Sequence, residues 1–76
     1  MNKNGFLKNK LVVLRAEMGW TQQELADRVK VSRQTIASLE KNKYNPSLIL
    51  AFEIAKEFGK DINEVFIYET EEGDNQ

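Results

Sequence analysis

The chain has 76 residues, of which 41% are hydrophobic and 30% are charged, and a chain of this length forms one small domain. It contains no cysteine and no histidine, which excludes disulfides, thiolate metal sites and the commonest general base. The longest aliphatic run near the N-terminus, residues 11–14, is too short for a signal peptide or a membrane span. We therefore expect a cytoplasmic protein with no membrane partner.

The net charge of −1 conceals two halves of opposite sign. Residues 1–47 carry nine basic and four acidic side chains, a charge of +5, whereas residues 48–76 carry two basic and eight acidic ones, a charge of −6. A basic half of this kind indicates a polyanionic partner such as a nucleic acid. The alternative is that the two halves are only differently solvated faces.

The first predicted helix covers residues 8–18. Apolar residues recur there every three or four positions, which is typical of an amphipathic helix, and they are Leu11, Leu14 and Met18. Gly19 is expected to end this helix, because glycine tolerates the left-handed conformation that often follows a helix C-terminus.

The second predicted helix covers residues 22–29, and the sequence TQQE at its start forms a capping box. In this motif the Thr21 hydroxyl accepts from the Glu24 amide, and the Glu24 carboxylate accepts from the Thr21 amide. Ser32 then caps a third helix that runs to about Lys41. A connection of only about three residues between two helices favours a steep crossing angle, as in a helix-turn-helix.

The turn sequence NKYNP separates the third helix from a fourth, which Ser47 caps and Gly59 ends. The fourth helix is so rich in apolar residues that we expect it to be the central and most buried one. A short fifth helix runs from Asp61, its expected cap, through Phe66. The sequence FIYE then predicts a strand that can pair with NGFL near the N-terminus.

The expected fold class is therefore all-α, with five short helices and a small two-strand sheet at the termini. One domain would cover residues 1–69, and residues 70–76 would form a disordered acidic tail.

The segment LRAEMGWTQQELADRVKVSRQTIASLEKNKYNPSLILAFEIAKEFGKDINEVF resembles the Cro/repressor-type (xenobiotic response element-like) helix-turn-helix family. The resemblance extends from about Lys10 to Phe66 and depends on spaced features such as TQQELA, VSRQTI, LEKNK and NPSL. It is strongest to short, single-domain bacterial regulators of transcription. It implies a lambda-repressor-like DNA-binding domain that acts as a homodimer on a palindromic operator.

The resemblance also implies roles for individual residues. It makes residues 32–41 the recognition helix, with base-reading positions at Arg33, Gln34 and Ser38. It places Gln22 beside the DNA backbone and implies phosphate contacts from Lys41, Lys43 and Tyr44.

Two further implications concern the framework of the domain. An ion pair between Arg15 and Glu40 would brace the first helix against the third, and the alternative for Arg15 is a phosphate contact. Lys30 stands where the family often has glycine, and a lysine in a left-handed conformation costs about 1 kcal/mol. Ser47 stands where some phage repressors have an arginine that enters the minor groove, so that contact is not expected here.

The side-chain chemistry of the third helix agrees with base recognition. Arg33 can donate two hydrogen bonds to guanine, and Gln34 can pair with adenine. Thr35 and Ser38 can also form hydrogen bonds, and the Thr35 methyl group can touch a thymine methyl group. Ser32, at the start of the helix, completes the expected phosphate contacts. The alternative is a solvated first turn with a good cap.

Large apolar side chains follow the start of the fifth helix, where little core remains to bury them. We expect them to form the two-fold interface of a homodimer, through Ile62, Val65, Phe66, Ile67 and Tyr68. The alternative is that Phe66 and Tyr68 close the core of the monomer. Trp20 and Phe6 are expected to pack inside the protein and not to stack on bases.

The predicted function is a sequence-specific DNA-binding regulator, acting as a repressor and without enzymatic activity. We expect no catalytic residue, no metal, no cofactor and no small-molecule effector. The pairs Glu53–Glu57 and Asp61–Glu64 are better explained as solvated acidic side chains than as catalytic or metal sites. Two alternatives remain open: an antitoxin that regulates its own toxin–antitoxin operon, and a protein-interaction module on the same fold.

Overall fold

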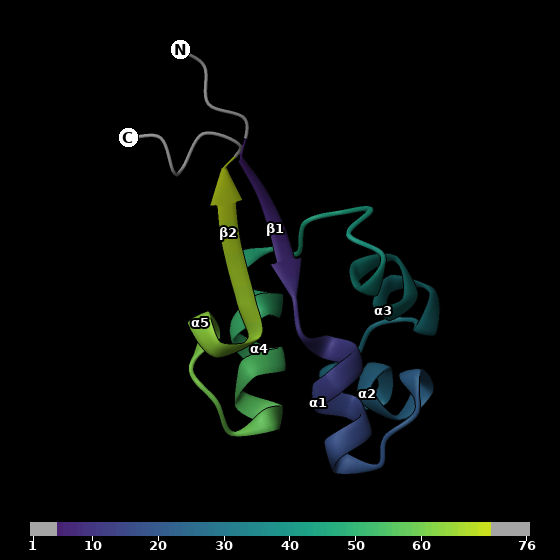
Figure 1. Cartoon of the computed structure of the whole chain (residues 1–76). Helices are drawn as coiled ribbons and strands as arrows, with labels where there is room; N and C mark the ends of the chain where they lie inside the picture. The colour runs from purple at the N-terminus through teal and green to yellow at the C-terminus, as the bar shows by residue number, and fades with distance from the viewer. Residues whose placement is uncertain (1–4, 71–76) are drawn as a thin grey trace.

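Five helices form one body, and two strands extend from it side by side (Figure 1). The structure is a computed structural model and describes residues 5–70. None of the helices within that range is long and apolar enough to cross a membrane. In chain order the elements are β1 (Gly5–Asn9), α1 (Leu11–Met18), α2 (Gln22–Val29), α3 (Arg33–Glu40), α4 (Leu48–Phe58), α5 (Ile62–Val65) and β2 (Phe66–Thr70). The predicted five helices with a small terminal sheet are confirmed.

Helices α2 to α5 begin at the predicted capping residues, whereas α1 was predicted from residue 8 and begins at Leu11, because residues 8 and 9 belong to β1. The Glu24 amide donates to the Thr21 hydroxyl at 3.0 Å, and the Thr21 amide donates to Glu24 Oε1 at 2.8 Å, which completes the capping box. Ser32 and Ser47 each accept from the amide three residues further on, both at 3.1 Å. Asp61 differs, because it occupies the cap position of α5 but its side chain makes no capping hydrogen bond.

The two strands pair antiparallel, with Gly5 opposite Thr70 and Leu7 opposite Tyr68. Because β2 already begins at Phe66, α5 ends one residue earlier than predicted, and Thr70 belongs to the strand and not to a tail. The rest of the predicted tail, residues 71–76, lies outside the described residues. The Tyr68 ring lies over Gly5, where a Cβ atom would be only 1.7 Å from Tyr68 Oη. A side chain at position 5 would therefore require the exposed Tyr68 ring to move.

One hydrophobic core joins all five helices to the base of the sheet. Its largest fully buried side chains are Leu11, Leu25, Ile36, Leu39, Ile54 and Val65. Val65 and Phe66, which are 0% and 8% exposed, pack inside this core. Their assignment to a subunit interface is therefore wrong, and for Phe66 the alternative of closing the monomer core holds.

The fourth helix is less buried than its composition suggests. Ala51, Ile54, Ala55 and Phe58 face the core, but the first part of α4 exposes large apolar side chains. These are Leu48, Ile49 and Phe52, which are 69%, 76% and 53% exposed. α4 supplies more buried side chains than any other helix, as expected, but its apolar composition did not show which side of the helix would be covered.

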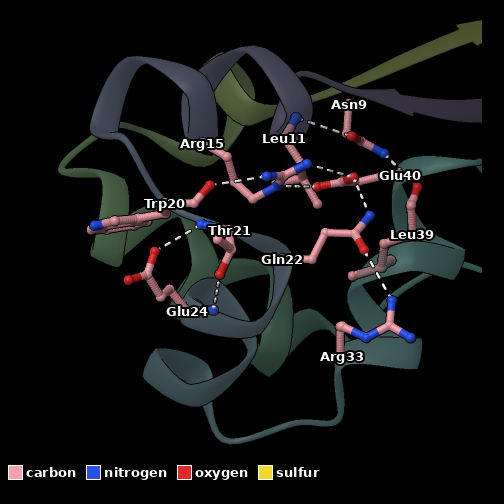
Figure 2. Close-up of polar contacts among 10 residues, drawn as sticks. All are labelled: Asn9, Leu11, Arg15, Trp20, Thr21, Gln22, Glu24, Arg33, Leu39 and Glu40. Carbon is pink, nitrogen blue, oxygen red and sulfur yellow. Dashed lines mark hydrogen bonds and ion pairs between the residues drawn. The ribbon is translucent and has the colours of Figure 1, made fainter.

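Arg15 and Glu40 form the ion pair that the resemblance implied, between α1 and the end of α3 (Figure 2). Arg15 Nε donates to Glu40 Oε2 at 2.6 Å, and Nη2 donates to Oε1 at 3.1 Å. The third nitrogen, Nη1, donates to the carbonyl oxygen of Trp20 at 2.9 Å. The hydrogen bond with Glu40 raises the pKa of the Arg15 guanidinium above its ordinary value, because it stabilises the charged form.

Removing either partner of this ion pair alone should destabilise the protein strongly, because it leaves the other charge without its partner. The side chains of Arg15 and Glu40 are only 17% and 6% exposed, so Arg15→Ala leaves a nearly buried carboxylate without its cation. We expect the free energy of unfolding to fall by about 2–4 kcal/mol, with a coupling above about 1 kcal/mol in a double-mutant cycle with Glu40→Ala, measured by urea denaturation. The exposed pair Lys8–Glu69, at 3.5 Å, is the control, and Lys8→Ala should cost less than about 1 kcal/mol. Equal losses at the two pairs would contradict this prediction.

The turn after α2 offers a second test, because Lys30 adopts the left-handed conformation at φ 64°. We expect Lys30→Gly to raise the free energy of unfolding by up to about 1 kcal/mol, since glycine lacks the Cβ atom that makes this conformation costly. As a control, Ala16→Gly on the exposed side of α1 should lower it by about 1 kcal/mol. Denaturation of the two variants beside the parent measures both effects, and a less stable Lys30→Gly protein would show that the turn is not strained.

Candidate nucleic-acid interface

The second and third helices form a helix-turn-helix unit with residues 30–32 as the turn. Lys30 reverses the chain, and the Val31 amide donates to the carbonyl oxygen of Ala26 at 3.0 Å. Ile36 and Leu39 then hold α3 to the core, at 0% and 1% exposure. Because these two side chains fix one face of α3, its opposite face and its first turn remain at the surface.

The four predicted base-reading side chains differ in how far they reach into solvent. Arg33 and Gln34 are exposed, whereas Thr35 and Ser38 are half-buried. The Thr35 hydroxyl lies 3.0 Å from the Ser32 hydroxyl, and the Thr35 amide donates to that same Ser32 oxygen. Arg33 and Gln34 are therefore the more accessible groups for hydrogen bonds to bases.

Gln22 connects the Arg15–Glu40 ion pair to the start of α3 (Figure 2). Its Nε2 donates to Glu40 Oε1 at 2.9 Å, and its Oε1 accepts from Arg33 Nη1 at 3.2 Å. A carboxylate can only accept, so Glu40 determines which end of the Gln22 amide faces Arg33. A continuous chain of polar contacts thus runs from Arg15 in α1 to Arg33. The sequence did not indicate the contact between Gln22 and Arg33.

The predicted phosphate-contacting residues after α3 lie at its C-terminus and in the following loop. Lys41, Lys43 and Tyr44 are all exposed. Asn9 of β1 binds both the end of α3 and this loop. Its Nδ2 donates to the Leu39 carbonyl oxygen at 2.8 Å and to Asn42 Oδ1 at 3.2 Å. The sequence pattern did not identify Asn9 as part of this site.

Asn9 has a second role at the start of α1. Its Oδ1 accepts from the Leu11 amide at 3.1 Å, so one side chain both binds the loop after α3 and holds the first turn of α1 (Figure 2). The signal that could have identified Asn9 is the preference for asparagine at helix starts.

The basic side chains around α3 have no ion-pair partner among the residues that the structure describes. Lys30, Arg33, Lys41 and Lys43 make no ion pair with any carboxylate in residues 5–70. Elsewhere in residues 5–70, Arg28 pairs with Glu57 at 3.6 Å and Lys60 with Glu64 at 4.0 Å, whereas Lys10 and Lys56 make no ion pair. Basic side chains without an ion-pair partner in residues 5–70 thus lie at both ends of α3. Such an arrangement is suited to contacts with the phosphate groups of DNA.

Trp20 and Phe6, both expected to pack inside the protein, differ in their surroundings. The Trp20 ring stacks on Phe58 with 5.4 Å between ring centroids, and the Arg28 guanidinium lies 4.0 Å from the Trp20 centroid. Phe6 is 46% exposed on β1, so it is less well packed than expected. Among residues 5–70 no three potential metal-ligating side chains gather in one place.

Comparison of the sequence with known proteins identifies the family. Residues 13–65 match the helix-turn-helix family. An uncharacterized HTH-type transcriptional regulator of Methanocaldococcus jannaschii is 56% identical over 66 residues, which cover 87% of this chain and all of the relative. The HTH-type transcriptional regulator YgzD of Bacillus subtilis is 46% identical over 65 residues, or 86% of this chain and 98% of the relative. A weaker similarity links the chain to antitoxin HipB of Escherichia coli, with 40% identity over 48 residues, 63% of this chain and 51% of HipB.

The fold has a close counterpart among solved structures. A protein from Bacteroides fragilis described as DNA-binding superimposes with a TM-score of 0.72 and 28% identity, over 80% of this chain and 98% of that one. The family match and the similar proteins indicate a DNA-binding helix-turn-helix domain. The surface of α3, with its unpaired basic side chains in residues 5–70, is consistent with that. The chain belongs to the Cro/C1-type helix-turn-helix family of DNA-binding regulators of transcription.

Proposed function

We propose that this protein is a repressor that binds a palindromic operator as a homodimer, with α3 in the major groove of each half-site. The observation that carries this proposal is the first turn of α3. It exposes Arg33 and Gln34 beside lysines that have no carboxylate partner among the described residues. An α-helix fits the major groove, and the residues at its N-terminus reach the base edges there.

Arg33 is the side chain best prepared for base recognition. Gln22 already holds one of its guanidinium nitrogens at 3.2 Å, and Glu40 holds Gln22. A side chain that is oriented before binding loses less conformational freedom in the complex. Arg33 on guanine and Gln34 on adenine would each discriminate against a wrong base by about 1–3 kcal/mol. Thr35 and Ser38, nearer to the core, would complete the base contacts.

Phosphate contacts would hold the protein at both ends of α3. Gln22 and Ser32 lie at the start of the helix-turn-helix unit, and Lys41, Lys43 and Tyr44 follow α3. Contacts of this kind fix position and supply affinity for any sequence, because each neutralised phosphate releases counterions. Specificity would then come from the base contacts alone.

A homodimer supplies the length of sequence that one helix lacks. One recognition helix contacts only a few base pairs, and two copies related by a two-fold axis double the recognised sequence, with half-sites about 34 Å apart. A dimer bound in this way would repress transcription by blocking access to the promoter. It would act in the cytoplasm, where bacterial and archaeal DNA lies.

An antitoxin role is the second candidate, and the similarity to HipB favours it. A regulator of that class would bind the operator of its own operon and also bind a toxin. A neighbouring gene for a small toxin, and copurification of its product with this protein, would support the antitoxin role. Repression without any such partner would support the simple repressor.

Sequence selection from random double-stranded DNA tests the proposal directly, and one palindrome should be enriched. Gln34→Ala should relax the preference at one or two base pairs of each half-site, because it removes the pairing with adenine. Lys43→Ala should instead weaken binding to all sequences alike and lower the slope of affinity against salt by about one unit.

The control for these variants is Lys60→Ala, which removes a charge that Glu64 already pairs with in the acidic half of the chain. It should leave both the selected sequence and the salt slope unchanged. If Gln34→Ala and Lys43→Ala both changed affinity uniformly across a library of sites, base recognition by α3 would be excluded.

A further inference from the structure

The first part of α4 exposes a surface that the DNA-binding function does not explain. Leu48, Ile49 and Phe52 lie at positions i, i+1 and i+4, so they form one exposed side of the helix, which flanks the side that faces the core. We call these three residues the apolar α4 face. Monomeric proteins rarely expose contiguous apolar side chains of this size, and such patches mark sites of association.

We propose that the apolar α4 face packs against the same face of a second copy of this chain, with the two α4 helices antiparallel across a two-fold axis. This inference rests on the proposed function, because it names the surface through which the operator-binding homodimer forms. The same surface patch on both subunits is the arrangement that a two-fold dimer requires.

The position of α4 suits two copies on one palindrome. Leu48 follows the end of α3 by only eight residues, directly after the loop that carries Lys43 and Tyr44. Half-sites about 34 Å apart place each recognition helix about 17 Å from the two-fold axis. The two shorter dimensions of the subunit are 21 and 20 Å. A contact formed at the start of α4, which the loop after α3 leads into, is compatible with the spacing of adjacent half-sites.

Charge favours a second copy as the occupant. In an antiparallel pair, the N-terminus of each α4 lies beside the middle of the partner helix, where the exposed Glu53 has no ion-pair partner in residues 5–70. A helix N-terminus carries partial positive charge, and Lys43 in the loop before it adds a full one. The positive α4 N-terminus and Lys43 of each copy would thus lie near Glu53 of the other copy. The two-fold axis makes this contact occur twice.

The surface at α5 and β2 is the weaker candidate for a dimer contact. Val65 and Phe66 are buried in the core, and Ile62 and Ile67 are half-buried. Tyr68 is 67% exposed, but its ring already covers Gly5 within the sheet. This segment therefore presents less continuous apolar surface than α4 does.

Sedimentation at micromolar concentration tests the proposal. The parent should sediment as a dimer, at twice the 8.8 kDa mass of the chain. Ile49→Glu places two carboxylates in the proposed contact, so we expect the dissociation constant of the dimer to rise at least about 100-fold. Val13→Glu is the matched control, because Val13 is 55% exposed on α1 and should tolerate the charge without loss of the dimer. Circular dichroism checks that both variants fold.

A cross-linking experiment locates the contact independently, because the chain has no cysteine of its own. Ile49→Cys should form a dimer with a short bifunctional thiol reagent, and Val13→Cys should remain a monomer. Efficient cross-linking of Val13→Cys alone would move the interface to α1 and overturn the proposal.

The outcomes separate this inference from the proposed function. A parent that stays monomeric with and without palindromic DNA, or an Ile49→Glu variant that still dimerises, overturns the interface. If the selection from random DNA enriches no palindrome but Ile49→Glu abolishes the dimer, only the operator-binding function is overturned. Loss of binding to the full palindrome in Ile49→Glu, with unchanged binding to a single half-site, supports both.

Discussion

The ion pair between Arg15 and Glu40 is the constraint on which the DNA-facing side of the protein depends. A buried ion pair adds little net stability compared with apolar side chains of similar volume, because both charges lose water. Its main effect here is to orient neighbouring helices and side chains. It fixes α1 to the end of α3, and the same carboxylate orients Gln22, which in turn holds Arg33. The side chain that we assign to guanine is thus positioned from inside the protein.

Helix ends were predictable because they depend on residues three or four positions apart. The capping box of Thr21 and Glu24, and the caps at Ser32 and Ser47, are local contacts that the sequence displays directly. Burial was predicted less well, because it depends on which elements meet in space. Val65 was expected at a surface and lies in the core. The same limitation affected α4, since apolar residues that bind another subunit look like core residues in a sequence.

The candidate site was predictable only in part. The exposed residues of α3 could be named because arginine and glutamine at a helix start suit base edges and contribute little to a core. The contacts that position them could not, because they join distant parts of the chain. Gln22 and Arg33 are 11 residues apart, and Asn9 lies 30 residues from Leu39. Hydrophobic periodicity carries no information about polar contacts at these separations.

The pairing of the two terminal strands has a consequence for how such a domain can be combined with others. Gly5 and Thr70, at opposite ends of the described chain, are direct partners in the sheet. A unit whose entry and exit points are neighbours can be inserted into a loop of another protein without separating the two halves of its host. The same proximity would allow the ends to be joined and the chain reopened elsewhere. The sheet thus makes this small domain suitable for insertion into other proteins.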